Sequence, residues 1–310
     1  MPKENLFDIA IVGYGPAAIT AAIYAARKQL RCILIGEVPG GEVVNSGDIE
    51  NWPGGGETDG IALSEAFVKH LRAHEDMVKI VQASITKVSW EKEGFRLHGK
   101  NGHEFRAKTV IYAAGRHPRL LNVPGEKEFK NRGVSYCATC DAPLFSGKAV
   151  AVIGGGNTGA EAVIMLQKIA TKTYLLHIDK QLTADPILVK NFRDDPKVEI
   201  IYNAKTTEIG GEAMVNSLTF EDTAAGEEKK LAVAGIFVAI GALPNTEPVK
   251  KLVELDEFGA IVADRYGATN VPGFFAAGDV TNIRDAQIVV AAGQGCSAAL
   301  SAGDYLSRLP

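Results

Sequence analysis

The stretch Asp8-Ile-Ala-Ile-Val-Gly13-Tyr-Gly15-Pro-Ala-Ala18 recurs in design at Lys148-Ala-Val-Ala-Val-Ile-Gly154-Gly-Gly156-Asn-Thr-Gly159. In both, a short apolar run leads into a glycine turn that opens a helix-forming segment. The first glycine permits a tight turn, the second lets the backbone approach a pyrophosphate, and the third position permits close packing of helix on strand. The two stretches therefore predict two strand–turn–helix units that bind dinucleotides.

A second repeated pattern lies where we expect the chain to pass between domains. Thr109-Val-Ile-Tyr-Ala-Ala-Gly115-Arg-His-Pro118 resembles Ile236-Phe-Val-Ala-Ile-Gly241-Ala-Leu-Pro244-Asn245, since each is an apolar strand ending in glycine with proline three residues later. We predict an α/β fold of two Rossmann-like nucleotide-binding domains, the second inserted into the first. The first comprises residues 1–116 and 246–310, and the inserted domain comprises residues 117–245. Two thin connections allow one domain to rotate on the other.

The composition excludes several classes of protein. Charged residues make up 23% of the 310 residues, apolar residues 46%, and the net charge is −4, so no basic surplus indicates binding to nucleic acid or an anionic membrane. No apolar run approaches the roughly 20 residues that span a bilayer. We expect a cytoplasmic protein that binds neither nucleic acid nor membrane.

The chain has four cysteines, which are Cys32, Cys137, Cys140 and Cys296. They are too few for a secreted disulfide framework. A zinc site needs four ligands, usually from two close pairs, and there is no second pair, so we expect no metal. The spacing of Cys137 and Cys140 suits a reversible disulfide with one reactive thiolate. Because this pair precedes the second glycine turn, we predict that electrons pass from a nucleotide to a disulfide.

With both glycine turns, Cys137-Ala-Thr-Cys140-Asp141 and Ala276-Ala-Gly-Asp279 in this order, the chain resembles low-molecular-weight thioredoxin reductases over nearly its whole length. The inserted half is also similar to the flavoprotein subunit of alkyl hydroperoxide reductase, through stretches such as Leu182-Thr-Ala-Asp185. The chain starts at its first glycine turn, so we expect it to lack the N-terminal thioredoxin-like domain of that subunit. The resemblance also implies a homodimer.

The resemblance implies an FAD in the first domain. Glu37 ends the second strand, 24 residues after Gly13, and is placed to accept from a ribose hydroxyl. The family usually has glutamine at Glu42 and a basic residue at Ala286, and Glu42 either lowers the flavin potential or is protonated. The FAD contacts that we expect are Gly13, Gly15, Pro16, Ala17, Gly36, Glu37, Gly40, Gly41, Glu42, Asn51, Ala114, Gly115, Gly278, Asp279, Gln287 and Ile288.

The resemblance also assigns roles around the cysteines. Cys140 is the thiol that contacts the flavin, Cys137 attacks the disulfide of the partner, and Asp141 is the nearby acid–base. Asp141 is also a candidate helix N-cap, and the two roles are compatible. Ala142 replaces the glycine usual in thioredoxin reductases, which would cost about 1 kcal/mol if the position needed positive φ.

The electron donor is predicted from the second nucleotide site. Reductases that use NADPH carry arginines at the positions of Ile178, Asp179 and Thr183, and their loss costs several kcal/mol because charged hydrogen bonds contribute roughly 1.5–3 kcal/mol each. NADH is therefore the preferred donor, and His177 either binds it or simply closes a strand. The expected NAD contacts are Gly154, Gly156, Asn157, Thr158, Gly159, His177, Asp179 and Gly241.

The sequence thus predicts a thioredoxin-disulfide reductase that passes electrons from NADH through FAD and the Cys137–Cys140 pair to a small carrier. The carrier is thioredoxin, or a thioredoxin- or glutaredoxin-like protein. Three alternatives stay open: the same reductase with ferredoxin or another non-pyridine donor, a dithiol oxidase that uses oxygen, and a flavin-bound redox sensor.

Overall fold

The structure is a computed structural model that describes residues 6–46, 48–49, 51–56, 58–92 and 94–309. Its contacts divide the chain into two compact units. Unit 1 is Met1–His117 with Leu243–Pro310, and unit 2 is Pro118–Ala242. The sequence places the corresponding boundaries after residues 116 and 245.

Unit 1 is built on a seven-stranded sheet with the order β5-β2-β1-β8-β7-β6, in which β19 also pairs with β8. Its central strands are apolar runs buried on both faces, as parallel strands covered on both sides must be. The parallel strands are β1 (Leu6–Val12), β2 (Cys32–Gly36), β5 (Val78–Gln82), β8 (Glu104–Tyr112) and β19 (Phe274–Ala276). The antiparallel strands are β6 (Ile85–Glu91) and β7 (Gly94–Gly99).

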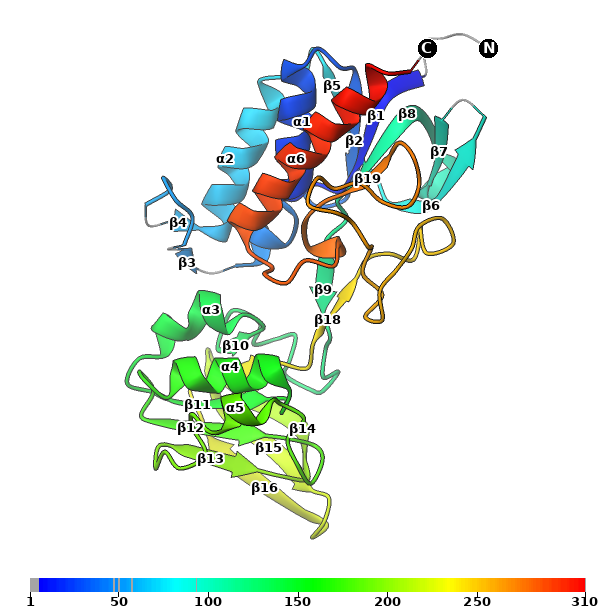
Figure 1. Ribbon diagram of the computed structural model, residues 1–310. Coiled ribbons are helices and arrows are strands. Elements are labelled where there is room, and N and C mark those ends of the chain that lie inside the picture. The colour runs from blue at the N-terminus through cyan, green and yellow to red at the C-terminus, as the bar shows by residue number, and fades with distance from the viewer. Residues whose placement is uncertain (1–5, 47, 50, 57, 93, 310) are drawn as a thin grey trace. The chain divides into compact units, whose positions relative to one another are not determined.

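Three helices lie together beside the sheet of unit 1, and they are α1 (Pro16–Arg27), α2 (Gly60–Arg72) and α6 (Ile288–Leu306) (Figure 1). The pairing of α1 with α6 is close because both are rich in small residues. A Cβ at Gly295 would overlap the carbonyl oxygen of Ala17. The shorter elements are η2 (Gly41–Asn45), β3 (Asp48–Ile49), β4 (Thr58–Asp59), η3 (Lys100–Gly102) and η5 (Gly278–Val280).

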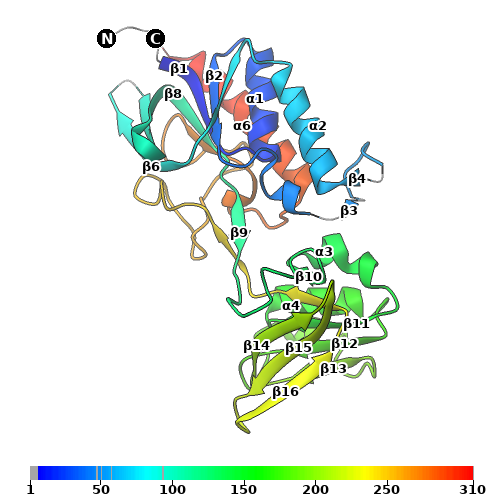
Figure 2. The same cartoon turned by 180° about the vertical axis from the view of Figure 1, so that it is seen from behind.

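Unit 2 is built on a five-stranded parallel sheet with the order β10-β17-β11-β12-β13. One face packs against the helices and the other against an antiparallel sheet of β14, β15 and β16, as Figure 2 shows. The parallel strands are β10 (Val134–Ser135), β11 (Ala149–Ile153), β12 (Lys172–Leu176), β13 (Val198–Ile201) and β17 (Gly235–Val238). The remaining elements are α3 (Ala138–Asp141), η4 (Ala142–Phe145), α4 (Asn157–Leu166), α5 (Pro186–Val189), β14 (Ala204–Gly211), β15 (Val215–Asp222) and β16 (Glu227–Ala232).

The chain passes between the units through β9 (Arg116–Pro118) and β18 (Ala242–Pro244), which pair with each other. The predicted α/β fold, with one Rossmann-like unit inserted into another, is confirmed. Among the described residues, no helix is both long and apolar enough to cross a membrane.

Candidate active site

The first glycine turn joins β1 to α1. Gly13 has φ +127°, and a Cβ there would overlap the carbonyl oxygen of Ala113. Gly15 is the N-cap of α1 and no side chain bonds to the helix end there. A Cβ at Gly15 would have no atom nearer than 3.8 Å, so the turn is open on that side. Open glycine backbone at an uncapped helix start fits a dinucleotide phosphate.

A second glycine loop contacts this turn. Gly40 has φ +88° and donates its N–H to the carbonyl oxygen of Tyr14 at 2.9 Å. A Cβ at Gly41 would lie 2.8 Å from the Cα of Gly15, so only glycine allows the two backbones to come this close. Glu37 is exposed directly after β2. These predicted FAD residues therefore follow β1 and β2 at one edge of the sheet.

Asp279 lies beside the start of α1. The preceding residue, Gly278, follows β19, and a Cβ there would lie 3.0 Å from the Cβ of Ala17. Burial raises the pKa of the Asp279 carboxyl above its usual value; Arg116, whose Nε lies 3.7 Å away, opposes this rise and Glu42 adds to it. A cofactor bound beside the start of α1 would contact the carboxyl oxygens of Asp279.

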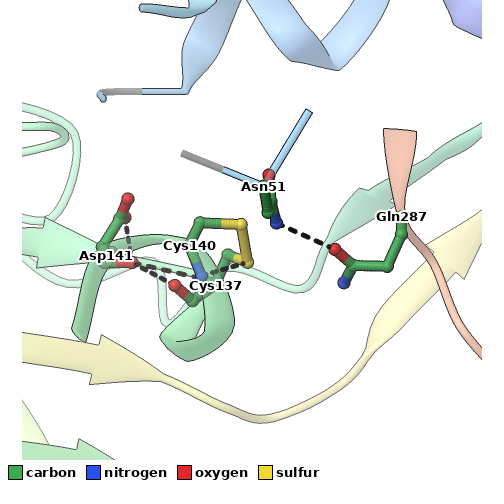
Figure 3. Close-up of a disulfide and its surroundings, with 6 residues drawn as sticks. Asn51, Cys137, Cys140, Asp141 and Gln287 are labelled. Atoms are coloured by element: carbon green, nitrogen blue, oxygen red, sulfur yellow. Dashed lines mark hydrogen bonds between the residues drawn. A yellow bond between two sulfur atoms is a disulfide. The ribbon is translucent and has the colours of Figure 1, made fainter. Parts of the chain in front are cut away.

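Two further predicted residues bond to each other, as Figure 3 shows. The amide nitrogen of Asn51 donates to Oε1 of Gln287 at 3.2 Å, and Gln287 is the N-cap of α6 (Ile288–Leu306). Glu42 is exposed and accepts from Asn45 Nδ2 at 3.2 Å.

Sequence reasoning left Asn245 out of the site residues. Its side-chain nitrogen donates to the carbonyl oxygen of Ala114 at 2.8 Å, its N–H donates to Gly115 at 3.0 Å, and its Oδ1 lies 2.8 Å from Nδ1 of His117. Asn245 thus ties together the two segments by which the chain leaves and re-enters unit 1. Its place after Gly241 and Pro244 in the repeated pattern was the signal for it.

The second glycine turn joins β11 to α4. Gly154 has φ +120°, and a Cβ there would overlap the carbonyl oxygen of Ala239. A Cβ at Gly159 would overlap the carbonyl oxygen of Gly154, so strand and helix pack closely. Gly156 is the N-cap of α4 without a side-chain bond, and the atom nearest to a Cβ there is Thr183 Oγ1 at 3.7 Å. The backbone of this turn also fits a dinucleotide.

The loop after β12 folds back onto this turn. The N–H groups of Thr183 and Ala184 both donate to the carbonyl oxygen of Gly155 at 2.9 Å. Asp185 and Asn157 exchange two hydrogen bonds, of 2.8 and 3.0 Å, at the first residue of α4. A carboxylate therefore lies close to the helix end that would receive a phosphate.

His177 lies under the turn rather than on its surface. It is buried, and its Nδ1 accepts the N–H of Gly155 at 3.1 Å, so its proton is on Nε2. Nε2 has no hydrogen-bond partner in the described part of the chain and lies 3.8 Å from the exposed Asp179 carboxylate. Gly241 also lies in unit 2, where its carbonyl oxygen accepts from the N–H of Arg119 at 2.9 Å.

Cys137 and Cys140 form a disulfide at the start of α3 (Figure 3). Both are partly exposed, and Cys137 Sγ accepts the N–H of Cys140 at 3.2 Å. The other cysteines differ, since burial raises the pKa of the Cys32 thiol to about 12 and Cys296 is unpaired on α6. α3 packs on α4, so the disulfide lies in the same unit as the second glycine turn.

Asp141 ends α3 and bonds to Ser135, whose Oγ lies 2.5 Å from Asp141 Oδ2. As N-cap of η4 it makes no side-chain bond to that helix. Ala142 has φ −53°, so the position does not need positive φ and alanine costs nothing there.

The chain matches the family model for pyridine nucleotide-disulphide oxidoreductases over residues 7–295. It is 44% identical over 302 residues to a protein named NADH dehydrogenase from Bacillus subtilis (strain 168), covering 97% of this chain and 59% of that protein. It is 45% identical over 313 residues to an alkyl hydroperoxide reductase subunit of Pseudomonas aeruginosa, covering 99% of this chain and 60% of that protein. The chain thus spans about three fifths of the length of these curated relatives.

Solved structures give the same likeness over whole chains. The thioredoxin reductase of Streptococcus pyogenes MGAS5005 has a TM-score of 0.92 at 34% identity, covering 99% of this chain and 100% of that chain. The thioredoxin reductase of Giardia duodenalis has a TM-score of 0.90 at 32% identity, covering 98% and 100%. The expected resemblance to low-molecular-weight thioredoxin reductases is confirmed.

Proposed function

Because the chain belongs to the pyridine nucleotide-disulphide oxidoreductase family, we propose that it is a flavin-dependent reductase that passes electrons from NADH to a carrier disulfide. The carrier is thioredoxin, or a thioredoxin- or glutaredoxin-like protein. The observation that carries the proposal is the Cys137–Cys140 disulfide in the unit that holds the second glycine turn. We further propose a homodimer, from the family resemblance, and a cytoplasmic location, from the four cysteines with one close pair.

Bound FAD would supply two-electron chemistry between a nicotinamide and a disulfide. The open backbone at Gly15 and the N–H groups that begin α1 would hold its phosphates. The exposed carboxylate of Glu37 would accept from a ribose hydroxyl, and Asp279 would contact the ribityl or phosphate side. Asn51, Gln287 and Ile288 would approach the flavin ring.

The cysteines would carry out the second half of the reaction. Two electrons and two protons open the Cys137–Cys140 bond. Cys137 then gives up its proton, which goes to the first carrier sulfur to leave, and its thiolate attacks the carrier disulfide. The N–H of Cys140 stabilises that thiolate because it already bonds to Cys137 Sγ. Cys140 next attacks the mixed disulfide, so its S–H proton passes through Asp141 to the departing carrier sulfur. The products are the Cys137–Cys140 disulfide and a carrier dithiol.

The groups at the second turn favour NADH over NADPH. Ile178, Asp179 and Thr183 stand where arginines would hold a 2′-phosphate. The Asp179 carboxylate is exposed and would repel that phosphate, while it could accept from a ribose hydroxyl.

One observation favours a second candidate, the same reductase with ferredoxin or another non-pyridine donor. Asp185 bonds to Asn157 at the first residue of α4, so a negative charge lies where the pyrophosphate of a nucleotide would bind. A nucleotide would then bind only after this pair opens.

The test is single-turnover kinetics without oxygen on Cys140→Ser. This variant should retain flavin reduction by the donor and lose reduction of oxidised thioredoxin, because the resolving thiol is gone. Cys296→Ser is the matched control, because it removes an unpaired cysteine of unit 1, and it should retain both reactions. Normal turnover of thioredoxin by Cys140→Ser would refute the proposed relay.

A further inference from the structure

Ser135 is a buried hydroxyl residue held in place by the sheet of unit 2. It ends β10, which pairs in parallel with β17 through Val134↔Ile236 and Ser135↔Phe237. Only 5% of Ser135 is exposed. The backbone of Ser135 is therefore fixed by the core, whereas the cysteine loop that follows is partly exposed.

The Ser135 hydroxyl bridges two parts of the cysteine loop. Its Oγ accepts the N–H of Cys137 at 3.1 Å and lies 2.5 Å from Oδ2 of Asp141. The carbonyl oxygen of Cys137 is farther away, at 3.4 Å. A hydroxyl has one proton, and the short contact to a carboxylate is in the range of charge-assisted O–H···O⁻ bonds. The proton is therefore donated to Asp141, and the lone pairs receive Cys137.

This bridge crosses α3, the helix that carries both cysteines. Cys137 is its N-cap and Asp141 its last residue, so one hydroxyl ties the two ends of α3 to β10 (Figure 3 shows the cysteines with Asp141). Holding Oδ2 fixes the plane of the carboxylate and with it the direction of Oδ1.

We propose that Ser135 is a positioning residue for carrier reduction, which holds the Asp141 carboxylate at the angle that serves the thiol proton. This inference rests on the proposed function, in which Asp141 carries the Cys140 proton to the departing carrier sulfur. The balance of the step is unchanged: the Cys140 S–H proton goes to Asp141, a sulfur–sulfur bond forms to Cys137, and the carrier sulfur leaves with a proton. Ser135 gains and loses nothing, and it acts only through Asp141.

The experiment compares Ser135→Ala, Ser135→Thr and Asp141→Asn in the full-length protein loaded with flavin. Its substrates are oxidised thioredoxin and the small aromatic disulfide dithiobis(nitrobenzoate), so the result does not depend on one carrier. A positioned acid–base contributes roughly a hundredfold or more, so we expect Ser135→Ala to lower kcat about tenfold and leave KM unchanged. Ser135→Thr keeps the hydroxyl and should restore most of the rate.

The double variant provides the readout that a merely structural role would not move. If Ser135 acts through Asp141, then Ser135→Ala should cost nothing further in an Asp141→Asn background. Ser217→Ala is the control, because Ser217 is an equally buried hydroxyl (6% exposed) on β15 and should keep full activity. Flavin reduction by the donor should be normal in Ser135→Ala, Ser135→Thr and Ser217→Ala.

The possible results separate the positioning role from the reductase function. Full activity of Ser135→Ala, or additive losses in the double variant, would overturn the positioning role while leaving the reductase intact. A rise in KM with unchanged kcat would overturn it too, since that points to carrier binding. Absence of carrier reduction in the unmutated protein would instead refute the proposed function itself.

Discussion

The two glycine turns have the same backbone design, but the large side chain that packs beside the turn comes from a different place in each unit. In unit 1 it belongs to the turn itself, and in unit 2 it belongs to the residue after the second strand. In unit 1 the middle residue of the turn is Tyr14 and β2 ends at Gly36, whereas in unit 2 the middle residue is Gly155 and His177 follows β12. A Cβ at Gly36 would lie 2.7 Å from Tyr14 Cβ, and one at Gly155 would lie 2.6 Å from His177 Cγ. Each pair holds one large and one small residue, in exchanged order.

The exchange shows which positions correspond. Gly13 donates to the carbonyl oxygen of Ile35 at 2.8 Å, and Gly154 donates to that of Leu176 at 3.0 Å. Ile35 and Leu176 therefore correspond. Two residues after Ile35 comes the exposed carboxylate of Glu37, whereas two residues after Leu176 comes the exposed apolar side chain of Ile178. The fingerprint thus determines the course of the backbone, and the residues after the second strand determine which groups a ligand meets.

The loop that returns to each turn differs as well. In unit 1 it is Gly40 that bonds to the middle residue, whereas in unit 2 Thr183 and Ala184 do so, with Asp185 following. In the proposed relay the first turn holds the flavin nucleotide, and the second binds the donor nucleotide, which leaves in every turnover.

The largest effect should come from Gly13→Ala. The variant combines a positive φ with backbone overlap at Ala113, which together should cost about 3 kcal/mol or more. We expect loss of flavin, measured as visible absorbance per chain, and a lower melting temperature. Gly259→Ala is the control in unit 1, with φ +81° and no atom within 4 Å of the added Cβ, and it should keep its flavin. Full flavin content in Gly13→Ala would refute the assignment of the first turn.

Gly154→Ala introduces the same strain in unit 2, where the Cβ overlaps Ala239. Because unit 2 has its own core, flavin should be retained and still be bleached by dithionite, while reduction by NADH should fall by at least about tenfold. Spectra recorded before and after each reductant check both points. Flavin loss as complete as in Gly13→Ala would contradict the assignment of the flavin to the first turn and of the donor nucleotide to the second.

A smaller effect should come from exchanging volumes beside the turns. Gly155→Ala should lower the free energy of unfolding by about 1–3 kcal/mol. His177→Ala should relieve part of that loss, because the added Cβ would meet only side chains, those of His177 at 2.6 Å and Leu182 at 2.7 Å. Gly36→Ala should not be rescued by Tyr14→Ala, since alanine keeps its Cβ and the carbonyl carbon of Gly13 also lies 2.7 Å away. Urea unfolding of the two double-mutant cycles measures this. Equal rescue in both units would contradict the distinction between a clash with side chains at Gly155 and a clash with Cβ and backbone atoms at Gly36.

The smallest effect should come from Asp179→Asn. The carboxylate is 69% exposed, so its charge acts weakly, and exposed charges contribute about 0.2–1 kcal/mol. We expect kcat/KM for NADPH to rise about two- to fivefold, with kcat/KM for NADH changed less than twofold. Steady-state kinetics with both donors provide the check. An unchanged ratio would show that Asp179 does not face the 2′ position.

The sequence predicted the features that are local. Both turns, the helices that they open and the spacing of Cys137 and Cys140 follow from residues close in the chain, and so did the inserted arrangement, because its repeated pattern is also local. The contacts that shape the sites join distant residues. Gly155 meets His177 22 residues away, and Asn245 reaches Ala114 across 131 residues. No period or motif encodes which distant residue each of them meets, so these contacts had to come from the structure, although the repeated pattern already marks the position of Asn245.

Ala142 and Ser135 illustrate the same limit at the cysteines. Whether alanine is strained at position 142 depends on the backbone φ there, and the sequence does not reveal that angle. Ser135 precedes the cysteine motif by two residues, but its proposed role depends on the hydrogen bond to Asp141 across α3, which the sequence does not show.

The measurement that tests the central claim most directly is bleaching of the flavin without oxygen by NADH, NADPH and reduced ferredoxin, followed side by side. We predict fast reduction by NADH, slower reduction by NADPH and none by ferredoxin, followed by reoxidation when oxidised thioredoxin is added. Reduction by ferredoxin alone would contradict the proposed relay, because the second glycine turn would then bind no donor.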